Sequence, residues 1–363
     1  MRRILLFLLI PILLTGTTFG ADAAQRQFDV LGGQELIGAL PDSVANELRT
    51  DSDLSSGFWD TAGRIVKIEM YASHRLLRDS IRASATLLAI VLFCAASGMF
   101  VNGAGRNAVV LVGVIALFVS SVADVKILIS AAVDAINELY SFSQLLLPVI
   151  SAACAASGSI TVSAAIYSGT ALFLQLLISF IKSLLVPLVY AFLALSAADA
   201  AFGTDSFGKI RKFLGSTVKN GLRTVLFLFG AYLSITGIIS GNADKLTLKA
   251  AKMTVSSVVP VVGGMVSDAT ETVLVGAKMV LNSVGTVGML AVLSILLIPF
   301  LRIGIRYLIL QITTALCSVF GLKEHIKVLD AIGSAMGYLL AMTSCCAVMA
   351  FVSCVCYMKV SVV

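Results

Sequence analysis

The chain has 363 residues, of which 58% are hydrophobic and only 13% are charged, and its mean hydropathy is +1.00. Soluble domains are about a quarter charged, so this composition excludes an ordinary water-soluble fold and makes lipid the main solvent of the chain. The net charge of +6 is scattered between apolar runs and no nucleic-acid-binding motif is visible, so we expect no nucleic acid as a partner.

The N-terminus has the features of a secretory signal peptide over residues 1–23. Arg2 and Arg3 precede an apolar run, and Ala21-Asp22-Ala23 resembles a cleavage site. An uncleaved anchor would deliver the next segment to the same side. Residues 24–82 have ordinary soluble composition and are predicted to form a small helical extracytoplasmic domain, too small for an enzyme core of its own.

Beyond Arg82 the chain divides at its charges into uncharged stretches, and a membrane span needs about 20 apolar residues. The sequence therefore predicts an all-α, polytopic membrane protein with about eight or nine transmembrane helices. It is divided into a first bundle (83–202), a basic cytoplasmic loop (203–223) and a second bundle (224–363). The uncharged stretches are 83–105, 107–123, 139–181 (two spans, turning at 157–159), 183–198, 224–243, 279–301, 307–322 and 331–358.

Charge in the connecting segments predicts the orientation of these spans. If the N-terminal domain is outside and the spans alternate, the basic 203–223 loop falls inside, together with Arg302 and Arg306. The acidic segment 124–138 and the segment 323–330 then fall outside. Basic loops inside are what the positive-inside rule requires.

The segment 242–278 interrupts the pattern of simple spans. It contains Pro260 and the Gly263-Gly264 pair, which break helices, so we expect an interfacial helix followed by a re-entrant turn. A helix restarting near Ser267 would place Asp268 and Glu271 on one face, either as capping groups or as the polar lining of a pore or docking site. Both roles remain open.

Small residues at four-residue spacing predict close helix packing. Gly237 with Gly241, and Gly333 with Gly337, are the clearest pairs.

Conventional site chemistry is scarce. The seven cysteines lie in apolar runs, and His74 and His325 lack nearby metal-type partners. We therefore expect no enzyme activity, no metal and no cofactor.

The chain resembles the stage III sporulation protein AE family. The resemblance is strongest from Ile239 to about Leu310, above all in Ser256-Ser257-Val258-Val259-Pro260-Val261-Val262-Gly263-Gly264 and in Ser267-Asp268-Ala269-Thr270-Glu271-Thr272-Val273. The order of signal peptide, small external domain and long polytopic region is also similar.

This resemblance implies a membrane subunit of a multiprotein, secretion-like channel complex that supports late forespore gene expression after engulfment. The implied location is the mother-cell membrane around the forespore, with the N-terminal domain in the intermembrane space. The implied partners are other stage III sporulation A proteins, including an ATPase and ring-forming subunits, and stage II sporulation protein Q from the forespore. The alternative is a stand-alone permease for a small molecule, because broken apolar segments suit a midplane binding site.

Overall fold

The described part of the chain is built from long helices joined by short turns. The computed structural model describes residues 38, 61–67, 74–156, 160–202, 207–258, 263–320 and 323–360. The predicted signal peptide lies outside these residues, and so does most of the predicted N-terminal domain. The helices are α6 (His74–Phe100), α7 (Ala104–Ala156), α8 (Ile160–Phe180), the π-helical η2 (Ile181–Leu185), α9 (Val186–Phe202), α10 (Gly208–Val258), α11 (Gly263–Ser318) and α12 (Lys323–Val360).

Five stretches of these helices are long and apolar enough to cross a membrane. The predicted all-helical class, with long apolar helices that could cross a membrane, is confirmed for the described residues, while the number of crossings stays a prediction. The stretches are Leu76–Phe100, Ala104–Ala155, Ser163–Phe202, Ser283–Ser318 and Lys323–Met358.

α12 is the central helix of the bundle. It packs against α7, α8, α9, α10 and α11, and none of its residues from Ala331 to Met358 is exposed. α7, α8, α10 and α11 surround it in that order, since each packs on the next while α7 and α10 do not pack on each other. The cysteines of α12 fit this position, because Cys345, Cys346 and Cys354 are small, apolar and buried.

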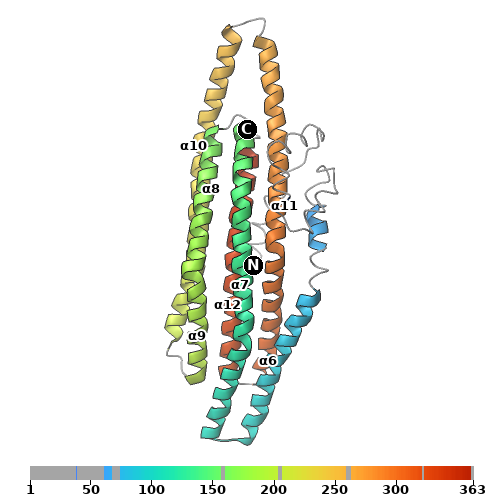
Figure 1. Ribbon diagram of the computed structural model, residues 1–363. Coiled ribbons are helices and arrows are strands. Elements are labelled where there is room, and N and C mark those ends of the chain that lie inside the picture. The colour runs from blue at the N-terminus through green and yellow to red at the C-terminus, as the bar shows by residue number, and fades with distance from the viewer. Residues whose placement is uncertain are drawn as a thin grey trace.

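The helices are much longer than a bilayer is thick. α7, α10 and α11 contain 53, 51 and 56 residues, so each is about 80 Å long at 1.5 Å per residue. The hydrocarbon core of a bilayer is about 30 Å thick. Figure 1 shows the helices running along one long axis, with α10 and α11 projecting beyond the others at one end.

Several predicted loops are helical, which corrects the division of the chain at its charges. Residues 124–138 are the middle of α7, and residues 302–306 lie inside α11. Most of the predicted loop 203–223 belongs to α10, which begins at Gly208. The 124–138 segment contains neither Pro nor Gly, so nothing in its local sequence stops a helix.

The 242–278 segment differs from the prediction in the same way. The expected interfacial helix is the continuation of α10, which runs to Val258. The next helix, α11, begins at Gly263 and not near Ser267. The Gly263-Gly264 pair therefore forms the N-terminus of α11. Pro260 is one of the four residues, 259–262, that the structure does not describe.

A glycine makes the turn between α6 and α7. Gly103 has φ +63°, a left-handed conformation that L side chains rarely adopt, and its carbonyl accepts a hydrogen bond from the Arg106 amide at 3.2 Å. α7 ends at Ala156 and α8 begins at Ile160, so the predicted turn at 157–159 lies between two described helices and is itself outside the described residues. The Ser151 and Ser163 hydroxyls on either side of it are 2.7 Å apart.

Candidate functional site: a charged waist

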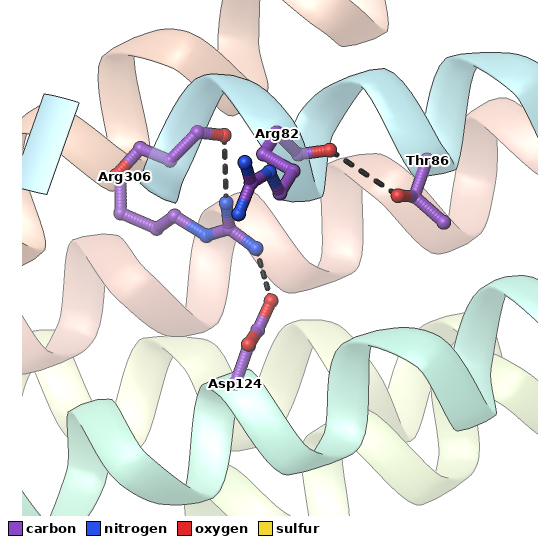
Figure 2. Close-up of polar contacts among 5 residues, drawn as sticks. Arg82, Thr86, Asp124 and Arg306 are labelled. Atoms are coloured by element: carbon purple, nitrogen blue, oxygen red, sulfur yellow. Dashed lines mark hydrogen bonds and ion pairs between the residues drawn. The ribbon is translucent and has the colours of Figure 1, made fainter. Parts of the chain in front are cut away.

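A buried arginine joins three helices near the middle of the bundle. Arg306 of α11 donates from Nη1 to the backbone carbonyl of Ser80 in α6, at 2.8 Å, and from Nη2 to the carboxylate of Asp124 in α7. Its side chain is 9% exposed and that of Asp124 is 37% exposed. Figure 2 shows the guanidinium reaching between α6 and α7.

More polar groups lie one helical turn from this contact. Ser84 follows Ser80 by four residues on α6, Ser121 precedes Asp124 by three on α7, and Arg302 precedes Arg306 by four on α11, so each pair shares a helix face. Three buried atoms here, Ser84 Oγ, Ser121 Oγ and Arg302 Nε, have no hydrogen-bond partner among the described residues. Such groups cost free energy unless water or another group satisfies them.

The Arg306–Asp124 ion pair contradicts the predicted alternating topology. That topology put Asp124 outside and Arg306 inside, on opposite faces of the membrane. Two groups in contact cannot be separated by a bilayer. A second contact also disagrees with that topology. His325 of α12 lies so close to Gly113 of α7 that a Cβ on Gly113 would overlap His325 Nε2. The start of α12 and the α6–α7 turn therefore lie at the same end of the bundle.

Contacts to α12 show which residues share a level along the axis. His325, near its start, lies beside Gly113, whereas Cys354, near its end, and Leu146 of α7 both lie against Gly288 of α11. α7 and α12 therefore run parallel, and contacts with α12 give the position of residues of the other helices along the bundle axis.

A contact with α12 also gives the position of α10 along the bundle axis. Cys345 lies between the two contact points on α12, and its thiol donates to the carbonyl of Leu222 in α10 at 3.9 Å. Leu222 is therefore level with about residues 134–138 of α7. Lys219 and Arg223, on either side of Leu222, share that level with Asp134 and Glu138 to within about a helical turn.

Several charges of α7, η2, α10 and α11 thus lie within a common stretch of the axis, which we call the waist. It consists of residues 124–138 of α7, Lys182 of η2, residues 219–223 of α10 and residues 302–306 of α11. Lys182 belongs here because Phe180 lies against Gly221 of α10.

Two apolar zones lie on either side of the waist. The hairpin zone contains the α6–α7 turn and, on α12, the charged residues Lys323, Glu324, Lys327 and Asp330 beside Gly113. The arm zone leads to the projecting ends of α10 and α11. Large exposed side chains such as Phe93, Val112 and Val119 cover the hairpin zone, and Leu145, Leu172 and Phe227 cover the arm zone. Each zone is about as tall as a bilayer core, so one bilayer cannot contain both.

Asp199 forms a second buried charged contact, between α9 and α10. Its carboxylate is fully buried, accepts a hydrogen bond from the Phe207 amide at 3.0 Å and lies 3.8 Å from Arg211 Nε. An acidic group just ahead of α10 also matches the positive end of the helix dipole. This contact fixes the turn from α9 into α10.

The structure describes the side-chain surroundings of only some of the residues predicted as sites. Gly333 and Gly337 face α11, where a Cβ would lie 2.9 Å from Gln311 Nε2 and 3.9 Å from Tyr307 Cε2, respectively. Gly237 and Gly241 lie in α10, and Gly263, Gly264, Ser267, Asp268 and Glu271 lie in the first turns of α11, away from the waist. The surroundings of these seven lie outside the described side chains, and their roles stay predictions.

Other candidate chemistry is limited in the described residues. No group of three His, Cys, Asp or Glu side chains among them could hold a metal ion. A groove of about 220 Å³ between α7 and α8 is lined in part by Tyr140, Gln144 and Tyr167, and it is smaller than the 300 Å³ or more that is typical of ligand sites.

Sequence reasoning missed the waist because it treated charges as loop markers. Asp124 and Arg306 were assigned to separate connections, and they are 182 residues apart. The only available signal was their rarity in so apolar a chain, since intramembrane ionisable groups usually have a partner.

Comparison with known proteins supports the resemblance seen in the sequence. Residues 61–361 match the family model described as stage III sporulation protein AE. The chain is 25% identical over 328 residues to stage III sporulation protein AE of Bacillus subtilis (strain 168), covering 88% of this chain and 80% of that protein. No solved structure matches. The family match covers most of the chain, from the waist to both ends of the bundle, and the chain belongs to the stage III sporulation protein AE family.

Proposed function

We propose that this chain is a membrane subunit of a multiprotein channel complex required for endospore formation. Family membership carries this proposal, because the matched region includes nearly all of the membrane-type helices. The apolar surface adds physical support: it is longer than one bilayer, so part of it needs cover from other proteins. A subunit of a larger assembly provides such cover, whereas a chain acting alone does not.

The proposed location is the mother-cell membrane around the engulfed forespore, with the N-terminal domain in the intermembrane space. The proposed partners are the other stage III sporulation A proteins, including the ATPase and the ring-forming subunits, and stage II sporulation protein Q. In this proposal, the segment from Pro260 to Glu271 lines the conduit or docks a partner at the tip of the α10–α11 projection.

Deletion of the gene in its own sporulating host tests the role. Cells lacking the protein should complete engulfment and then fail to express a late forespore reporter. Complementation by the Asp268→Asn/Glu271→Gln variant should be impaired if these acids act in a conduit or docking site. Normal spore yield in the deletion strain would refute the proposal.

A flux assay separates the complex subunit from a permease. The purified protein in liposomes should show no substrate-saturable transport without its partners. Saturable flux of one small molecule through the isolated protein would contradict the proposal and establish a stand-alone permease.

A further inference from the structure

Two faces of the waist carry opposite charge and lie on opposite corners of the bundle. On α7, Asp134 and Glu138 are exposed; on α10, Lys219 and Arg223 are exposed. α7 and α10 are diagonal in the ring of helices around α12, as α8 and α11 are, with α8 on one side and α11 on the other. The acidic face therefore points away from the basic face.

No ion pair with another described side chain neutralises either face. The ion pairs of Asp199 with Arg211 and of Asp124 with Arg306 lie elsewhere. Asp134 accepts only a hydrogen bond from the Ser130 hydroxyl, at 3.2 Å. Lys219 lies 5.8 Å from the centre of the Tyr338 ring, a contact that leaves its positive charge in place.

Apolar side chains flank the charges on both faces. On α7, Ile127 is 59% exposed on one side of the acids and Leu145 is 46% exposed on the other. On α10, Phe213 is 68% exposed before the basic pair and Phe227 is 73% exposed after it. The acidic face thus has the order apolar, charged, apolar along the axis. On the basic face the exposed Lys212 and Phe213 precede the basic pair and Phe227 follows it, so the charge there has the opposite sign.

We propose that the acidic α7 face of one copy docks on the basic α10 face of a second copy of this chain. The two faces are level, so docked copies stand side by side with their long axes parallel, and their apolar zones stay aligned in one membrane. The contact is head-to-tail, because the two faces differ. Each copy keeps one free face of each kind, so the contact repeats into a row, or into a ring if the rotation closes.

Charge reversal tests this contact in the full-length protein reconstituted in detergent or nanodiscs. The Asp134→Lys/Glu138→Lys variant has two basic faces, and the Lys219→Glu/Arg223→Glu variant has two acidic faces. Each variant alone should dissociate at roughly tenfold higher protein concentration than wild type, because like charges then meet. Mixing the two variants, or combining all four changes in one chain, should restore association, since opposite charges face each other again.

Lys182→Glu is the matched control, because Lys182 is exposed at the same level on η2 but lies on neither face. It should leave association unchanged. Circular dichroism should show the same helicity for every variant, which separates lost docking from lost folding. A wild-type protein that stays monomeric at high concentration would overturn the proposal. So would oligomers that survive both reversals, or reversals that do not rescue each other. The test involves no sporulation partner and is independent of the proposed function.

Discussion

Arg306 shows how a charge is accommodated inside an apolar bundle. Its guanidinium makes two directed contacts, to a carbonyl on α6 and a carboxylate on α7, in the forked geometry that lysine cannot reproduce. The two partners of the ion pair are unequal, since Arg306 is almost fully buried while Asp124 is about one-third exposed. Removing Arg306 and removing Asp124 should therefore lower the free energy of unfolding by different amounts.

We predict that Asp124→Ala destabilises the protein more than Arg306→Ala does. Loss of Asp124 leaves a buried positive charge with one carbonyl partner and should lower the free energy of unfolding by about 3 kcal/mol. Loss of Arg306 leaves a carboxylate that solvent can reach, while the Ser80 carbonyl lies within the α6 helix, and should cost about 1–2 kcal/mol. Denaturation in detergent followed by circular dichroism measures both. Lys126→Ala, at an exposed charged residue of the same helix outside the proposed docking face, is the control and should change little. Equal losses for the two variants would contradict the assigned burial.

Gly113 offers a second prediction at the residue scale, because it makes room for His325. A Cβ at this position would overlap the imidazole and come within 2.6 Å of Cys94 Sγ. Gly113→Ala should therefore destabilise the protein by about 1–3 kcal/mol through overpacking. Gly98→Ala is the matched control in α6, where a Cβ meets nothing within 4 Å. It should be neutral or stabilising by up to about 1 kcal/mol. If both variants behave alike, α12 does not begin against α7.

At the scale of elements, Asp199 joins the end of α9 to the start of α10. Asp199→Ala removes both the hydrogen bond from Phe207 and the ion pair with Arg211, and should lower the unfolding free energy by about 1–3 kcal/mol. Asp199→Asn keeps an oxygen to accept the amide hydrogen bond and should cost less. Thermal unfolding of the two variants would show the order. A larger loss for Asn than for Ala would contradict this account of the turn.

Elements were predicted well where composition alone decides them. The helical class, the separation of α7 from α8 and the apolar character of most of α6, α8 and α12 all follow from runs without charge. The continuity of α7 and α11 did not follow, because a charged segment such as 124–138 forms a loop in one protein and a helix in another. The choice depends on partners such as Arg306, which come from distant parts of the chain.

At the scale of the whole molecule, the predicted single layer of alternating spans is replaced by two zones. Long continuous helices stack these two apolar zones along one axis. The sequence predicted the apolar segments but not their stacking, because the period of hydrophobicity is the same in both arrangements. The central place of α12 was equally hidden, since a buried helix and a lipid-facing helix are both apolar throughout. The consequence is functional: the apolar surface of one zone must be covered by something other than lipid, such as another protein.

The distance between two labels on α7 tests the central claim, that this helix passes straight through its charged middle. Leu111 and Leu145 are exposed and lie in different apolar zones, so spin labels at Leu111→Cys and Leu145→Cys, with the native cysteines replaced, should not disturb packing. A continuous helix places them about 50 Å apart at 1.5 Å per residue. Pulsed electron–electron double resonance should then show one narrow distribution of label-to-label distances near that value. A distance below about 30 Å would mean that the chain reverses between 124 and 138, and the waist with its two zones would not exist.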